Sequence, residues 1–154
     1  MKLMMTLVLS LFAALALPSC GKVQLSLTPE PQAEGQKKLY ITANGKTITA
    51  TMADNDTAKE FAKKLEDGPV TVRMRANGFE HYGPLGFSLT SHDRRVTAVS
   101  GDIMLYNSNN ICIFYGNNIW SYTPLGKVDG LSAEELKAFF GEGDISVTYS
   151  LGDR

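Results

Sequence analysis

The sequence predicts a mainly β domain with two helices, in which the strands close into a barrel. Short runs of alternating apolar and polar residues recur from residue 39 onward, as is typical of half-buried strands. Two longer segments carry the apolar stripe and the capping residues of amphipathic helices. Many short strands interrupted by only two helices favour a barrel with helices packed against it.

The first strands are expected to form a β-hairpin. Residues 39–42 and 47–52 flank Asn44-Gly45, the dipeptide most typical of a two-residue hairpin turn. In the second of these runs, apolar residues alternate with threonines. One face of this strand is therefore expected to be buried and the other hydrated.

A helix is expected next, over residues 55–67. Thr57 and Glu60 have the spacing of a capping box, and Gly68-Pro69 follows the last residue of the apolar stripe. Alternation then returns over residues 69–74, which predicts a strand.

The middle of the domain combines a glycine-rich segment with further strands. Residues 77–87 are dense in glycine and aromatic residues, so we expect tight turns there and no regular element. A short strand is expected over 94–99, and alternation at 120–123 indicates another. The runs 103–106 and 111–115 are apolar on both faces, which predicts a central hairpin covered from both sides.

The second helix is expected over residues 132–140. Ser132 and Glu135 form a capping box, and Gly141 provides the stop signal. Residues 145–149 then close the domain as a strand.

An export signal is predicted ahead of the domain, at residues 1–19. Lys2 supplies the positive charge, and the apolar run over residues 3–17 is shorter than the ~20 residues that cross a bilayer as a helix. Leu17-Pro18-Ser19-Cys20 resembles a lipobox, the sequence read by lipoprotein signal peptidase. We expect cleavage before Cys20 and attachment of lipid, palmitate included, to this cysteine. An ordinary secretory signal is the alternative.

Residues 20–37 are expected to form a flexible tether between the lipid and the domain at residues 38–152. This stretch is rich in proline and charge and has no hydrophobic period. A coil of this length reaches ~20–25 Å, which would hold the domain clear of the lipid headgroups. The expected location is the bacterial cell envelope, at the periplasmic face of the outer membrane.

Composition narrows the possible partners. The full sequence has 15 Lys and Arg against 16 Asp and Glu, and its basic residues are scattered, so a nucleic-acid partner is not expected. With Cys20 lipidated, Cys112 has no partner for an internal disulfide, and it is interpreted as a small core residue. Stability must then come from the hydrophobic core.

Several short motifs carry the residue types of functional sites but lack the required geometry. His81 and His92 each adjoin a carboxylate, yet neighbouring residues on a strand point apart, so we interpret them as solvated loop residues. Ser91-His92-Asp93 is interpreted as a turn, since contiguous residues cannot build a catalytic triad. Asp54-Asn55-Asp56 is interpreted as a helix start and not a calcium loop. No metal or cofactor is expected.

The order of several motifs resembles a family of small bacterial proteins with a cyclophilin-like fold. The resemblance runs from about residue 39 to residue 151 and implies a closed cyclophilin-like β-barrel with two helices. It implies no activity by itself. The motifs that carry it are Asn44-Gly45-Lys46-Thr47-Ile48-Thr49-Ala50, Gly83-Pro84-Leu85-Gly86, Gly101-Asp102-Ile103, Ile113-Phe114-Tyr115-Gly116, Trp120-Ser121-Tyr122 and Leu131-Ser132-Ala133-Glu134-Glu135-Leu136.

True cyclophilins isomerise prolyl bonds with an arginine and a nearby Phe-x-x-Gln segment. Arg73, Arg75 and Phe79 lie in the comparable region, but the residue three positions beyond Phe79 is Tyr82 and not glutamine. No catalytic residue is therefore carried over from the resemblance.

Aromatic residues give the best candidate for a functional site. Rings interleaved with glycine and asparagine could form an apolar groove with polar groups at its edge. We expect an envelope protein that binds a peptide, protein segment or small ligand in this groove without strong catalysis. The alternatives are a divergent peptidyl-prolyl isomerase acting on exported proteins and a structural partner domain in an envelope complex. The expected groove residues are Arg75, Phe79, Tyr82, Phe87, Tyr115, Trp120 and Tyr122.

Overall fold

The computed structural model describes residues 38–152 of the 154-residue chain. The predictions for residues 1–37, namely the export signal, the lipid on Cys20 and the tether, lie outside the described residues. Within the described part, the chain forms nine strands and two helices. The strands are β1 (Lys38–Ala43), β2 (Lys46–Met52), β3 (Val70–Ala76), β4 (Glu80–Pro84), β5 (Arg94–Ala98), β6 (Asp102–Tyr106), β7 (Asn110–Phe114), β8 (Asn118–Val128) and β9 (Ile145–Leu151); the helices are α1 (Asp56–Glu66) and α2 (Ala133–Phe140).

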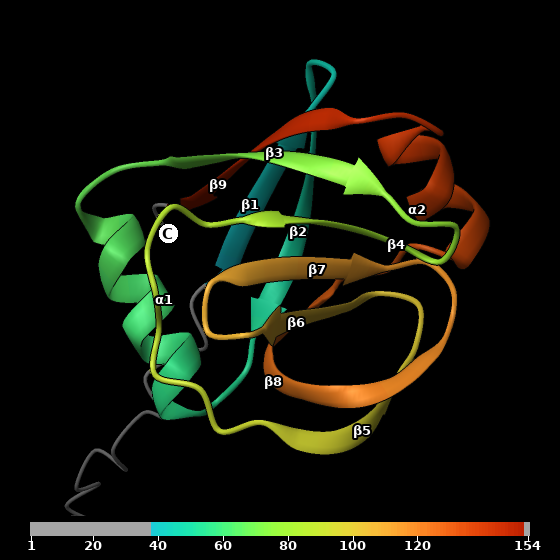
Figure 1. Ribbon diagram of the computed structural model, residues 1–154. Coiled ribbons are helices and arrows are strands. Elements are labelled where there is room, and N and C mark those ends of the chain that lie inside the picture. The colour runs from blue at the N-terminus through green and yellow to red at the C-terminus, as the bar shows by residue number, and fades with distance from the viewer. Residues whose placement is uncertain (1–37, 153–154) are drawn as a thin grey trace, which may run out of the picture. The chain divides into compact units, whose positions relative to one another are not determined.

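The strands pair antiparallel and close into a ring. Hydrogen bonding runs in the order β2-β1-β9-β3-β4-β7-β6-β8, and β8 returns to pair with β2. β5 is attached outside this ring and pairs with β8. Figure 1 shows α1 and α2 on opposite sides of the strands. The predicted mainly β class, the two helices and the closed arrangement are confirmed.

The turns explain two of the strand pairings. Asn44 and Gly45 both have positive φ, at 50° and 71°, as a two-residue hairpin turn requires, and they join β1 to β2. Asn107 and Ser108 adopt the same left-handed region between β6 and β7. Both hairpins expected from the sequence are present.

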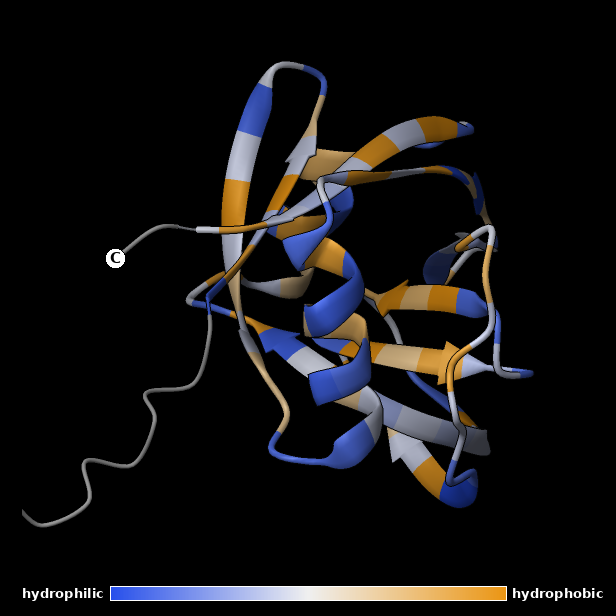
Figure 2. Ribbon diagram, turned by 90° about the vertical axis from the view of Figure 1, so that its left-hand side faces the viewer, coloured by the Kyte–Doolittle hydropathy of each residue, from blue (hydrophilic) through white to orange (hydrophobic). Residues whose placement is uncertain are grey.

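The helix caps agree with the sequence at α2 and differ at α1. At α2, the Ser132 side chain and the Glu135 side chain form the predicted capping box. At α1, the predicted box is wrong: Asn55 caps the helix and accepts a hydrogen bond from the Ala58 amide. Thr57 is buried and donates to the Thr90 carbonyl oxygen instead. Figure 2 shows the hydrophilic residues of α1 on its outward side.

The ring encloses one continuous apolar core. Phe61 of α1 packs edge-on against Tyr149 of β9, with ring centroids 6.1 Å apart. Both side chains have no solvent-exposed surface. The largest fully buried members of this inner core also include Leu39, Ile41, Met74, Ile103, Leu105, Ile111, Ile113, Leu125 and Phe140.

One strand was missed in the glycine-rich segment, which was expected to be irregular over residues 77–87. β4 lies there and pairs with both β3 and β7. Gly83 stands within β4 because β3 comes unusually close: a Cβ at this position would lie 2.8 Å from Cγ1 of Val72. The glycine therefore marks a close approach of two strands and not a break.

No helix within residues 38–152 has the length and apolar character needed to span a membrane.

Candidate functional site

A second hydrophobic cluster lies on the outward face of the strands that enclose the inner core. In β7, Ile111 and Ile113 belong to the inner core, whereas Cys112 and Phe114 belong to this second cluster, as strand alternation requires. We call this set the outer cluster. Its buried members are Ala98, Met104, Cys112, Phe114 and Tyr122, and its half-buried members are Phe79, Tyr82, Val96 and Tyr106.

Phe114 holds the rings of the outer cluster together. Its ring stacks on Phe79 at 6.2 Å and meets Tyr122 edge-on at 5.4 Å. Tyr122 in turn meets Tyr106 edge-on at 6.1 Å, and its hydroxyl accepts a hydrogen bond of 2.8 Å from the Asn118 amide. Burial raises the pKa of Tyr122 to about 12, so the phenol stays neutral at physiological pH. These contacts hold the aromatic rings of the outer cluster in fixed positions.

Trp120 lies beside the outer cluster. It precedes Tyr122 by two residues on β8 and therefore points to the same face, directly opposite Val96 of β5. Unlike Tyr122, it is 53% exposed. Ile119 and Val99 are also exposed, at 52% and 39%, so all three exposed large apolar residues of the described part lie on or beside the β5–β8 pair. Ile119 projects from the opposite face to Trp120, so the exposed apolar surface on this face consists of Trp120 and the half-buried rings beside it. Such a surface is typical of an interaction site.

Glu80 places a carboxyl group within the outer cluster. It stands opposite Phe114 in the β4–β7 pairing and is only 6% exposed. Asn77 donates to Oε1 at 3.3 Å, whereas Oε2 is buried and has no well-formed hydrogen bond. Burial raises the pKa of Glu80 despite opposing contributions from Asn77 and from the weakly donating Cys112 thiol. Such a carboxyl retains its proton to a higher pH than an exposed one.

Cys112 is a core residue, as predicted. Its side chain is 2% exposed, and burial, with the neighbouring Glu80, raises the pKa of the thiol far above its usual range. A reactive cysteine requires an accessible thiolate. The Cys112 thiol is neither accessible to solvent nor ionised.

The interpretation of Glu80 and His81 as solvated loop residues is wrong. Both lie in β4, and His81 is fully buried between the rings of Tyr115 and Phe140, at 5.6 and 5.1 Å. Its Nε2 donates to the carbonyl oxygen of Gly143 at 3.0 Å, and its Nδ1 has no partner. Burial lowers the pKa of His81, which keeps the imidazole neutral. His92, by contrast, is exposed, as expected.

The expected groove residues divide between three places. Phe79, Tyr82 and Tyr122 belong to the outer cluster, and exposed Arg75 lies opposite Tyr82 in the β3–β4 register. Trp120 adjoins them, as described above. The outer cluster therefore contains or adjoins five of the seven residues.

The other two expected residues lie elsewhere. Tyr115 belongs to the inner core, and its hydroxyl donates to the Glu80 carbonyl oxygen at 3.0 Å. Phe87 packs against the same core near α1, with Lys64 Nζ 5.6 Å from its ring centroid. Neither residue is a member of the outer cluster. Glu80, Met104 and Tyr106 were not among the expected residues; the alternation of β6 is the signal that could have identified Met104 and Tyr106.

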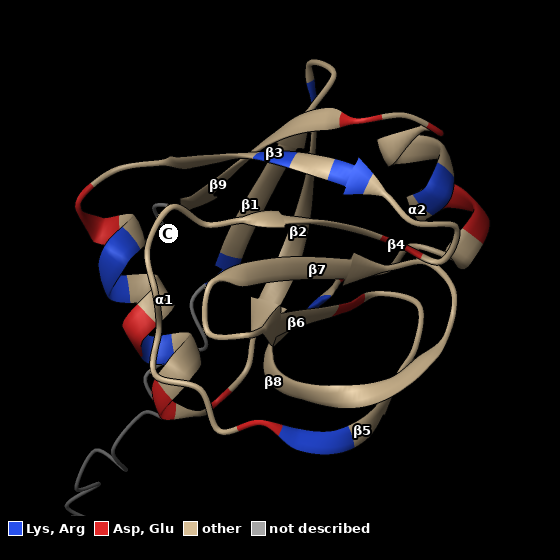
Figure 3. Cartoon of the chain, viewed as in Figure 1, with Lys and Arg blue, Asp and Glu red and all other residues tan. Residues whose placement is uncertain are grey.

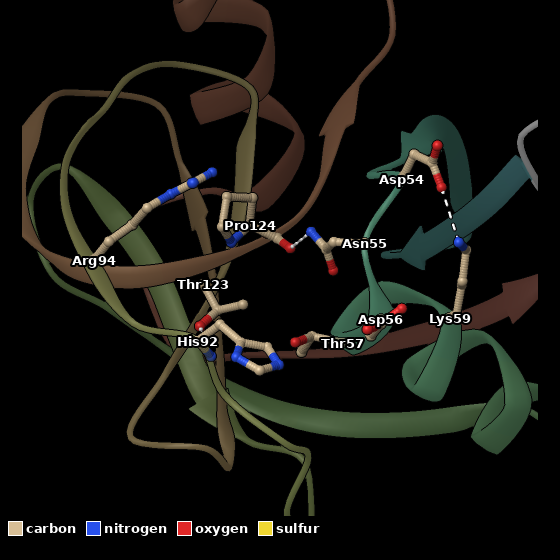
Figure 4. A pocket seen from close by; sticks show the side chains of 9 residues that line it. All are labelled: Asp54, Asn55, Asp56, Thr57, Lys59, His92, Arg94, Thr123 and Pro124. Atoms are coloured by element: carbon tan, nitrogen blue, oxygen red, sulfur yellow. Dashed lines mark hydrogen bonds and ion pairs between the residues drawn. The ribbon is translucent and has the colours of Figure 1, made fainter.

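A separate hollow of about 480 Å³ lies at the start of α1. Figure 4 shows the α1 side chains on one side of it, and His92, Arg94, Thr123 and Pro124 on the other. It is open and polar, and two of its charged side chains pair at the surface, with Lys59 Nζ 3.1 Å from Asp54 Oδ1. Among residues 38–152, no group of three or more His, Cys, Asp or Glu side chains could hold a metal ion.

A ring of eight antiparallel strands with two helices and an aromatic outer face defines a small cyclophilin-like domain. The model of the cyclophilin-like family matches residues 41–150 of this sequence, and the chain belongs to that family.

Among solved structures, the chain is similar to McbB in complex with tryptophan. The two share 16% identity with a TM-score of 0.52, over 75% of this chain and 45% of the McbB chain. The chain thus spans less than half the length of McbB, and the likeness is one of fold. A comparison with curated proteins found no match.

Proposed function

We propose that this protein is a lipid-anchored component of the bacterial envelope whose cyclophilin-like domain binds a peptide segment or small ligand at its aromatic outer face, without strong catalysis. The observation that carries the proposal is Trp120, which is 53% exposed beside the outer cluster. Tryptophan in such a position offers a large apolar area together with an N–H donor. The half-buried rings of Phe79, Tyr82 and Tyr106 extend this surface.

The rigidity of the surface supports binding. The buried rings of Phe114 and Tyr122 contact the half-buried rings of Phe79 and Tyr106 and hold these two rings in place. A preorganised surface loses little conformational freedom when a ligand docks. The McbB structure contains tryptophan, so a small aromatic molecule binds to that protein, whose fold is similar.

The chemistry of the outer cluster argues against strong catalysis. Its thiol is buried and neutral, and its one carboxyl, Glu80, is also buried, with only the Asn77 amide and that neutral thiol beside it. Efficient acid–base or nucleophilic catalysis needs a base or nucleophile paired with a partner within hydrogen-bond reach.

Replacing Trp120 by alanine should cost less than about 1 kcal/mol of stability, because a half-exposed ring loses little burial on truncation. The same change should remove most of the affinity for a fluorescein-labelled peptide of alternating valine and serine, measured by anisotropy. In the wild type, acrylamide should quench the tryptophan emission readily. A blue-shifted, unquenched emission, or unchanged peptide affinity in the variant, would contradict the proposed site.

Replacing Cys20 by alanine should release the protein from membranes into the soluble fraction, because the anchor is proposed to be lipid on this cysteine. Fractionation followed by a high-salt wash measures this directly. A variant that still pellets with membranes after the wash would show that another anchor holds the protein.

A second candidate function, prolyl isomerisation, is favoured by Arg75. Exposed Arg75 stands opposite half-buried Tyr82 in the β3–β4 register, which puts a cationic residue next to the aromatic surface. The glutamine of true cyclophilins is absent, so we expect at most slow isomerisation in a protease-coupled assay. Cyclophilin-like rates that fall on Arg75→Ala, and not on the neighbouring Arg73→Ala, would establish the isomerase instead.

A further inference from the structure

The end of the sheet offers an unpaired strand edge. β5 pairs with β8 through residues 94–98, and within the described residues no other strand pairs with it. Figure 1 shows β5 at the lower margin of the sheet. Edge strands present backbone donors and acceptors that can pair with an added strand.

This edge is positively charged. Arg94 and Arg95 begin β5, both are exposed, and neither makes an ion pair in the described part of the chain. Of the nearby carboxylates, Asp102 pairs with Lys127 at 2.7 Å, and Asp93, next to Arg94, accepts from the Thr123 hydroxyl at 2.7 Å. The two arginines therefore outnumber Asp93, the one carboxylate beside them that lacks a cationic partner among the described residues. Figure 3 shows the resulting basic segment at the start of β5.

The same strand pair carries the exposed apolar residues. Ile119 stands opposite Thr97, and Trp120 stands opposite Val96, so the two large side chains project from opposite faces of the β5–β8 pair. A strand paired with β5 would thus lie near Trp120 on one face of the sheet and near Ile119 on the other. Acidic side chains on that strand would find Arg94 and Arg95.

We propose that the free edge of β5 takes up an extended acidic segment of a partner protein as an added strand. This inference rests on the proposed function and specifies its partner. A second copy of this chain fits the edge poorly, since its β5 has no acidic side chain to pair with Arg94 and Arg95. An extended acidic segment could hydrogen-bond to the backbone of β5 and pair with the charges of Arg94 and Arg95.

Three fluorescein-labelled peptides of eight residues test the proposal on the full-length protein. One alternates valine and glutamate, and the second alternates valine and lysine. The third is the glutamate peptide with prolines at two adjacent central positions, one of which must direct its backbone nitrogen toward β5. At low salt, the glutamate peptide should bind at least tenfold more tightly than the lysine peptide. The proline peptide should lose this affinity, because proline cannot donate to a strand ladder.

Charge reversal provides the decisive comparison. Arg94→Glu with Arg95→Glu should invert the preference between the two charged peptides. Lys137→Glu, a charge reversal at another exposed position, on α2, should leave it unchanged. Added salt should weaken the wild-type preference.

Each other outcome overturns the inference. Equal affinity for both charges with continued dependence on Trp120 would reject the acidic partner and leave the proposed function standing. Undiminished binding of the proline peptide would reject strand addition. Binding of none of the peptides would mean that the arginines protect the edge from pairing. Binding only to vesicles of anionic lipid, or dimerisation in sedimentation experiments, would assign the surface to a membrane or to a second copy.

Discussion

Replacing Phe114 by alanine should destabilise the domain by about 3–5 kcal/mol, the typical cost of removing a fully buried phenylalanine. Phe114 has no exposed surface, and its ring contacts both Phe79 and Tyr122. Truncation would leave a cavity between the outer cluster and the strands beneath it. Because small domains have total stabilities of about 5–15 kcal/mol, this loss is a large fraction of the whole.

Urea unfolding of the wild type, Phe114→Ala and Trp120→Ala would measure the contrast. The two substitutions both remove one aromatic ring from the same face of the protein, but only Phe114 is enclosed. Phe114→Ala should lower the urea midpoint strongly, and Trp120→Ala should lower it little. Similar losses for both would mean that Trp120 is part of the core and would remove the main support for a ligand surface.

The sequence could predict most elements of the fold, but not which aromatic rings lie together in the candidate site. The fold follows from local signals: Asn44-Gly45 specified a hairpin turn, the capping box at Ser132 began α2, and apolar runs on both faces indicated that β6 and β7 are central. Each signal depends on neighbours in the sequence. Local reasoning therefore succeeded for most elements.

The candidate site depends on contacts that local patterns do not specify. Phe87 and Trp120 are both aromatic residues near glycine, but Phe87 packs beside α1 while Trp120 stands at the end of the sheet. The position of Trp120 depends on the pairing of β5 with β8, in which it stands opposite Val96, 24 residues earlier in the chain (120 − 96 = 24). Glycine density also concealed β4, and with it the burial of Glu80 and His81.

Glu80 and His81 impose opposite pH dependences on stability. The pKa of Glu80 is raised in the folded state, so its contribution is full below its ordinary value of 4.5 and is lost as the pH rises through the folded pKa. The pKa of His81 is lowered, so its contribution is full above 6.5 and is lost as the pH falls below that value. A variant at Glu80 isolates the pH dependence due to Glu80, because His81 contributes equally to the stability of the variant and of the wild type.

Replacing Glu80 by glutamine should therefore remove a loss of stability that the wild type suffers as the pH rises. Glutamine keeps the shape and the acceptor for Asn77 but cannot ionise. The free energy of unfolding of the variant minus that of the wild type should rise by about 1.4 kcal/mol per pH unit between pH 4.5 and the folded pKa of Glu80. Above the folded pKa, this difference should stay constant. Urea midpoints from pH 4.5 to 8 give this difference, with exposed Glu134→Gln as the control. Parallel curves for wild type and Glu80→Gln would show that folding does not raise the pKa of Glu80 above 4.5, which would contradict the effect inferred from its burial.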